Sequence, residues 1–138
     1  YTIGSDTNYN NSTGPVTYVD WFWKASATAG FSVVTFTAPA SGNGTVAHGL
    51  GRAPAMAIIK CRGTTGEWSV YHQGLTTPDT YRLKLNLTDA QASVANSWLN
   101  TDSTNLGYLV GTTAVASQTH VAYCFAEVPG FSKLGTYT

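Results

Sequence analysis

Three histidines and one glycine-rich turn are the residues of this chain whose types could do chemistry. His48, the turn 49–52 (Gly-Leu-Gly-Arg) and His72 lie in the segment 44–75, and His120 lies much further along the chain. Imidazole nitrogens bind zinc, and glycine-rich turns can bind phosphate through main-chain N–H groups. However, the histidine spacings match no zinc pattern, and the turn lacks the lysine and the helix of a phosphate loop. We therefore expect no metal or phosphate site, and predict that this segment is structural.

The acidic residues form no catalytic pattern either. Glycoside hydrolysis needs two carboxylates that face one cleft, whereas the acidic residues of this chain are scattered singly from Asp6 to Glu127. The chain also lacks the Gly-x-Ser-x-Gly sequence of a serine hydrolase and any cysteine–histidine signature of a thiol enzyme. We expect a protein that is not an enzyme and that uses no cofactor.

The composition favours an assembly protein over a nucleic-acid or membrane protein. Charged residues make up 10% of the chain, against roughly 25% in an ordinary soluble domain. A neutral surface suits close-packed or extracellular β proteins, because few charges must lose water at a subunit contact. The seven basic residues balance the seven acidic ones and form no run, so we expect no nucleic-acid partner. No apolar run approaches the roughly 18 residues that cross a bilayer, so we expect no membrane insertion.

Alternating apolar residues predict an all-β fold of one domain, residues 18–138, after an extended N-terminal arm, residues 1–17. We expect a β-sandwich or barrel of about eight antiparallel strands, with 56–62 as a central strand. The sequence Thr-Asp-Ala-Gln at 88–91 matches a capping box, and it predicts one short helix near 89–98. The predicted strands cover residues 18–24, 30–37, 45–48, 56–62, 68–72, 81–87, 106–110, 120–128 and 130–138.

Two pairs of residues leave alternatives open. Cys61 and Cys124 lie on small apolar faces of predicted strands, where they are either two buried free thiols or a disulfide between neighbouring strands. Tyr71 and Tyr108 could be exposed rings that stack on a sugar, or they could fill the core as most aromatic residues do.

The two ends of the predicted domain are similar in sequence. Val19, Trp21 and Trp23 alternate as Val121, Tyr123 and Phe125 do, and each run leads into a Gly-Phe-Ser sequence, at 30–32 and at 130–132. Segment 121–138 thus repeats the strand pair 19–37, at a spacing that suits tandem β domains. The copies are either pseudo-symmetric hairpins within one closed sandwich, or terminal strands that complete the sheet of a neighbouring subunit.

These sequences resemble a domain of unknown function in structural proteins of bacteriophages and environmental viruses, commonly tail fibres. The resemblance covers nearly all of the chain after Tyr18, and its most specific part is the final motif, HVAYCFAEVPGFSKLGTYT. It rests also on the segments TYVDWFWKA, GFSVVTFT, HGLGRAPAMAIIKCR, VYHQGL and LNLTDAQ. The resemblance implies units that recur in tandem and brings no catalytic residues.

The hypothesis from the sequence is a structural subunit of an extracellular or virion fibre that binds copies of itself head to tail by sharing strands. The alternative is a tail-fibre module that binds a receptor or a cell-surface glycan. The residues expected to carry assembly are the aromatic and apolar ones of the two repeated segments: Tyr18, Trp21, Phe22, Trp23, Phe131, Leu134 and Tyr137.

Overall fold

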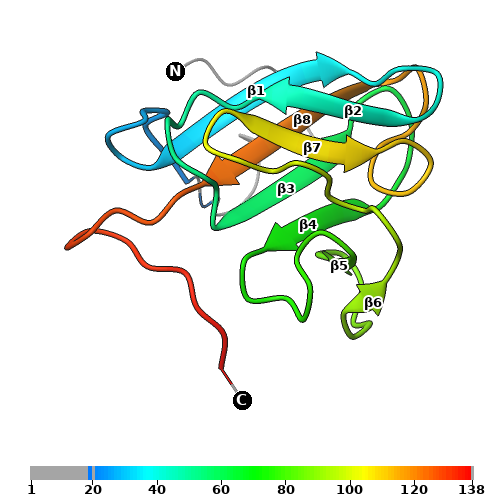
Figure 1. Cartoon of the computed structure of the whole chain (residues 1–138). Coiled ribbons are helices and arrows are strands. Elements are labelled where there is room, and N and C mark those ends of the chain that lie inside the picture. Colours follow the sequence, from blue (N-terminus) through cyan, green and yellow to red (C-terminus); the bar gives the residue numbers. More distant parts are fainter. Residues whose placement is uncertain (1–18, 20, 138) are drawn as a thin grey trace, which may run out of the picture.

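The computed structural model describes Val19 and residues 21–137, which form eight antiparallel strands in two sheets (Figure 1). One sheet has six strands in the order β1-β8-β3-β4-β5-β6, and the other pairs β2 with β7. The all-β, sandwich-like fold predicted from the sequence is confirmed. The strands are β1 (Phe31–Thr37), β2 (Asn43–Ala47), β3 (Met56–Cys61), β4 (Trp68–His72), β5 (Tyr81–Lys84), β6 (Ala92–Ser93), β7 (Asn105–Leu109) and β8 (Thr119–Phe125).

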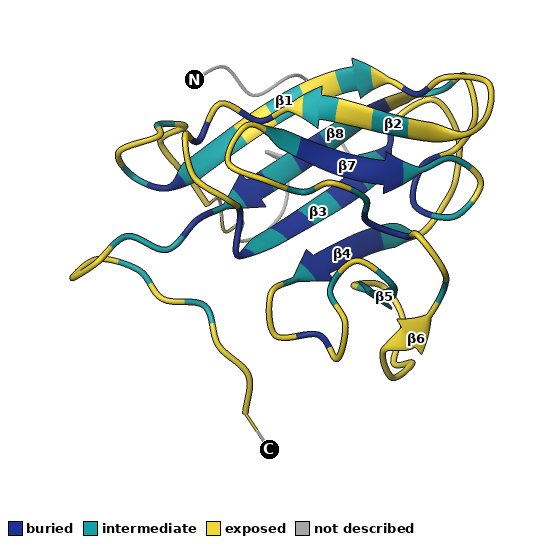
Figure 2. Ribbon diagram, in the orientation of Figure 1, coloured by how far each residue is buried: buried dark blue, intermediate teal, exposed yellow. Residues whose placement is uncertain are grey.

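The core lies between the two sheets, where alternate residues of each strand point inward. On β3 these residues are Ala57, Ile59 and Cys61, and on β8 they include Ala122 and Cys124; all five are buried. Figure 2 shows the buried residues concentrated on β3, β4, β7 and β8. Because β3 is flanked by β8 and β4, the predicted strand 56–62 is central, as expected, whereas β2 belongs to the two-stranded sheet.

The opposite face of the six-stranded sheet is also apolar, although no second sheet of the described residues covers it. Phe125 of β8 lies opposite Phe31 of β1 and Met56 of β3, so three large side chains form one row across the sheet. Val33, Tyr123 and Ile58 form the next row in the same way. Five of these six side chains are partly exposed, and the sixth, Val33, is exposed. We call the two rows the outer apolar face.

The short helix expected near 89–98 is absent, and this prediction is wrong. Within the described part of the chain, residues 92–93 form β6, which pairs with β5. The side chain of Gln91 does not cap a helix but bonds Thr76: Gln91 Nε2 donates to Thr76 Oγ1 over 2.8 Å, and Gln91 Oε1 accepts from Thr76 N. Asn96 has a positive φ of 62°, which a helix does not allow. Tertiary contacts of this segment therefore outweigh its local capping signal.

The two terminal strands are not formed either. Of the predicted strand 18–24, Tyr18 and Asp20 lie outside the described residues, and residues 21–24 have no ladder partner. Predicted strand 130–138 begins in a turn: Gly130 has φ 76°, and Val128 and Ser132 form an isolated bridge. Gly30, its counterpart in the first copy, has φ 70° and precedes Phe31, which forms an isolated bridge with Ser26. Both copies thus keep a glycine with positive φ in a bridged turn, but neither copy pairs its own two strands: β1 of the first copy pairs with β8 of the second.

Candidate functional site

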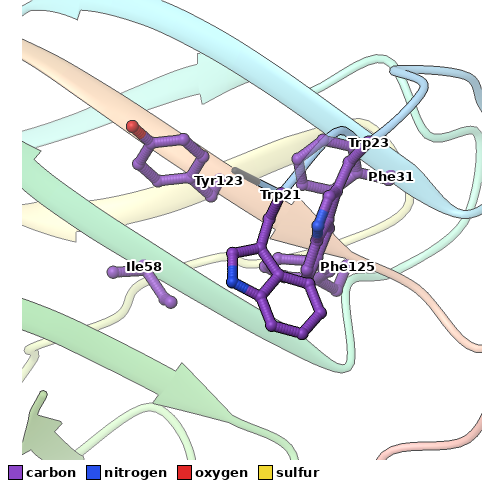
Figure 3. A pocket seen from close by; sticks show the side chains of 6 residues that line it. All are labelled: Trp21, Trp23, Phe31, Ile58, Tyr123 and Phe125. Carbon is purple, nitrogen blue, oxygen red and sulfur yellow. The ribbon is translucent and has the colours of Figure 1, made fainter. Parts of the chain in front are cut away.

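The segment before β1 lies on the outer apolar face. The ring of Trp23 meets those of Phe31 and Phe125 edge-on, with centroids 5.2 Å apart in both pairs. Phe31 and Phe125 are themselves 4.9 Å apart. Figure 3 shows the indoles of Trp21 and Trp23 gathered with these rings, and Tyr123 and Ile58 bordering the open part of the hollow. This aromatic hollow has a volume of about 390 Å³.

A second hollow joins the two ends of the described chain. It is a groove of about 540 Å³, with Phe22, Trp23 and Lys24 on one side and residues 131–134 on the other. Its floor is the end of the six-stranded sheet, where Phe31, Met56 and Phe125 lie. We call it the terminal groove. Segments more than one hundred residues apart in the sequence thus form one apolar surface.

The C-terminal segment is held beside this groove by polar contacts. The carboxylate of Glu127 accepts from the main-chain N–H of Leu134 over 3.0 Å and from Nε2 of Gln73 over 3.1 Å. Nε2 of Gln73 also lies 3.4 Å from the Leu134 carbonyl oxygen. These bonds position Phe131 and Leu134 on the wall of the groove, although the segment is not in a sheet.

Much of this surface is exposed to water. The exposed fractions are 81% for Trp21, 50% for Trp23 and 75% for Phe131. Six of the ten most exposed large apolar side chains among the described residues lie at the chain ends: Val19, Trp21, Phe22, Trp23, Phe131 and Tyr137. Isolated exposed apolar residues are ordinary, but a contiguous cluster of aromatic residues marks an interaction site.

The structure therefore brings together most of the residues predicted for assembly. Phe22, Trp23, Phe131 and Leu134 line the terminal groove, and Trp21 lines the adjoining aromatic hollow. Tyr137 lies elsewhere, in a hollow of about 230 Å³ beside His72 and Leu83. Tyr18 lies outside the described residues.

Sequence reasoning missed the floor of this surface: Phe31, Met56, Ile58, Tyr123 and Phe125 were predicted only as strand residues. Their alternation with small core residues predicted strands that have apolar residues on both faces. The sequence did not predict that β1, β8 and β3 are neighbours, because strand order depends on long-range pairing. The register between these strands aligns the rows.

Tyr71 and Tyr108 are core residues, so they do not face a ligand. Their exposed fractions are 8% and 2%, and burial raises the pKa of both hydroxyls. For Tyr71 the charge of Asp79 adds to this effect. The ring of Tyr108 packs 4.7 Å from Phe36 and against the main chain of Gly44, where an added Cβ would clash with it. Of the two alternatives left open by the sequence, the core is the correct one.

Cys61 and Cys124 are buried free thiols, and no disulfide joins them. They lie on neighbouring strands, but Cys124 is opposite Ala57, and Cys61 is opposite His120. The two cysteines are therefore displaced by four positions along the ladder, roughly 13 Å, which is too far for a disulfide. Burial raises the pKa of the Cys124 thiol to about 11.

All three histidines bond to main-chain groups. Nδ1 of His48 accepts from the N–H of Leu50 over 3.2 Å, and its Nε2 lies 3.1 Å from the Asp102 carbonyl oxygen. Nε2 of His120 accepts from the N–H of Val115, and Nδ1 of His72 accepts from the N–H of Gly74. These rings support turns.

The described residues, Val19 and 21–137, lack two further features. They contain no group of three or more histidine, cysteine or acidic side chains that could hold a metal ion. None of their segments is a helix of the length and apolarity that a membrane span requires.

Comparison with known proteins gives one match, to a family model. Searches of curated proteins and of solved structures found no match for this chain. The model of a domain of unknown function, DUF7483, matches residues 1–138. The chain therefore belongs to the DUF7483 family.

Proposed function

We propose that this protein is a structural subunit that binds copies of itself head to tail and so builds an extracellular or virion fibre. The observation that supports this most is the apolar surface formed by the two chain ends. Trp21 and Phe131 are 81% and 75% exposed, yet both lie beside half-buried aromatic rings. A second subunit would remove this surface from water, at about 25 cal/mol per Å² of apolar area.

The open edge of β1 supports strand sharing. β1 pairs with β8 on one side, while its other side ends the sheet within the part of the chain that the structure describes. The register of this pair and the bond from Ala38 N to Gln118 O show which residues of β1 bond to β8: the N–H and C=O groups of its even-numbered residues face β8. The N–H and C=O groups of Val33, Thr35 and Thr37 therefore face away from β8, at the edge of the sheet. Sheet edges are usually protected by charges, proline or bulges, and β1 has neither a charged residue nor a proline.

The low charge of the whole chain agrees with repeated close contact between subunits. Because only 10% of residues are charged, stacking many copies buries few ions. A contact between two different surfaces repeats without closing unless its rotation closes a ring. The resemblance of the sequence to a domain of bacteriophage structural proteins, stated above as an expectation, fits the same role.

Electron microscopy of the purified chain tests this proposal. We expect filaments for the wild type, and only short particles or monomers for Trp21→Ser combined with Phe131→Ser. Val115→Ser is a matched control, because Val115 is exposed but lies away from the chain ends. Monodisperse wild-type particles across a range of concentrations would refute the proposal.

The exposed indoles support a second candidate, a receptor- or glycan-binding module. Trp21 and Trp23 line an open hollow in which a sugar face could stack. This candidate predicts a discrete particle that binds a glycan array, and loss of that binding in Trp21→Ala. An array without signal would eliminate it.

A further inference from the structure

We propose that the terminal groove receives residues 1–18 of a second copy of this chain. This inference rests on the self-assembly proposed above and names its donor and its receptor. An extended peptide that enters an apolar groove is a common recognition mode.

The groove has the dimensions and lining of a peptide receptor. Its volume is about 540 Å³, and three separate parts of the chain form it: the segment before β1, the end of the sheet and the C-terminal segment. The bonds of Glu127 and Gln73 to Leu134 hold the C-terminal wall in place. The receptor is therefore formed before any partner binds, which reduces the entropy lost on association.

Charge makes residues 1–18 a fitting occupant. Lys24 and Lys133 are the charged side chains among those that line the groove, and no acidic residue is among them. Residues 1–18 contain one charged side chain, Asp6, together with apolar and aromatic residues such as Ile3 and Tyr9. Opposite charges at the rim would orient the segment, while its apolar residues cover the floor.

Chain length allows the donor to reach another subunit. Eighteen residues span at most roughly 60 Å when extended, whereas a domain of this size has a radius of gyration of about 14 Å. Entry of the segment into the groove of its own chain is the competing occupancy, and the cross-linking experiment below distinguishes it from entry into a second copy.

Cross-linking between full-length chains tests the donor and the receptor together. One chain carries Tyr9→Cys and the other, labelled with heavy isotopes, carries Ala29→Cys at the groove. The matched control replaces Ala29→Cys by Thr45→Cys, on an exposed position of β2. The native cysteines are buried, so background coupling is small. We expect at least fivefold more mixed disulfide with Ala29→Cys than with Thr45→Cys.

Charge reversal tests the recognition chemistry with the same readout. Lys24→Glu combined with Lys133→Glu on the receptor chain should lower the mixed disulfide at least threefold, and Asp6→Lys on the donor chain should restore it. Unchanged yield after reversal of both lysines would overturn the inference.

The outcomes separate this inference from the proposed function. Filaments that form without a mixed disulfide at Ala29→Cys would overturn the inference and leave self-assembly standing. A chain that carries both Tyr9→Cys and Ala29→Cys tests the other occupant. If it forms an intramolecular disulfide with a yield independent of dilution, and no mixed disulfide forms between chains, the chain's own segment fills the groove and the inference is overturned. A wild type that stays monomeric at all concentrations would refute self-assembly itself.

Discussion

The indole of Trp23 meets the ring of Phe125 edge-on, with the two planes at 74°. This contact fastens the segment before β1 to β8, and Phe31 of β1 completes the cluster. Both of the hollows at the chain ends are built around these three rings.

Trp23→Ala should lower the free energy of unfolding of the monomer by about 1 kcal/mol, because it removes two aromatic pairs. Trp21→Ala is the matched control: Trp21 is 81% exposed, so its loss should change stability by less than about 0.5 kcal/mol. Urea denaturation at a concentration below assembly measures both. Equal losses in the two variants would contradict this role for Trp23.

Gly107→Ala should destabilise the fold strongly. A Cβ on Gly107 would overlap the main-chain carbonyl of Leu99, so β7 or the loop before it would have to move. We expect a loss of about 3 kcal/mol, at the upper end of ordinary single substitutions. Gly135→Ala is the control, since an added Cβ there meets no neighbour within 4 Å. Thermal denaturation of the two variants should give clearly different midpoints; coincident midpoints would show that β7 is not packed as described.

Stability should fall in mild acid because of His120. Burial, above all, lowers the pKa of this imidazole; Lys60 lowers it further, and the Gln118 carbonyl opposes the shift. The folded-state pKa therefore lies below the unfolded value of about 6.5. The unfolded chain then binds the proton first, so the stabilisation is complete above about pH 6.5 and decreases as the pH falls toward the folded-state pKa.

Urea denaturation midpoints at pH 7.5 and pH 5.5 measure this effect. His120→Gln should be less stable at pH 7.5, because it loses the stacking on Phe36. It should also show a smaller difference between the two pH values than the wild type. A variant with the same pH dependence as the wild type would assign the effect to another group.

Neither thiol should react with a disulfide reagent while the chain is folded. Cys124 is fully buried, and with a pKa of about 11 only about one thiol in a thousand is ionised at pH 8. Cys61 is 6% exposed. Both should react within minutes in denaturant, and a reducing agent should not change the melting temperature. Reaction of one equivalent of thiol in the native protein would contradict the described packing.

Strand positions could be predicted from the sequence where local alternation is strong. Predicted strand 68–72 coincides with β4, and 56–62 includes β3 with one residue to spare. The helix near 89–98 failed because Gln91 bonds Thr76 in another loop, a contact that the capping pattern does not reveal. The terminal strand 18–24 failed because Trp23 packs onto the face of the sheet rather than pairing along its edge.

The candidate site was predictable only in part. The repeat of valine and aromatic residues at both ends pointed to Trp21 and Phe131, and the structure places their segments around adjoining hollows. It did not point to Met56, whose role depends on the order of strands, or to Lys24, whose role depends on how the segment before β1 packs on the sheet. Tyr71 and Tyr108 could not be assigned from composition, because a core ring and a ligand-facing ring occupy the same alternating positions.

Residues 22–24 and 131–134 meet at the terminal groove, and this has a topological consequence. Because Phe22 and Leu134 line the same groove, a short linker could join their segments. New termini could then be opened in the exposed turn between β3 and β4, at residues 63–66, since circular permutation is best tolerated in such turns. A permuted chain would keep the sandwich and connect its wall segments covalently. The position of the termini in the sequence is thus independent of the packing that stabilises the fold.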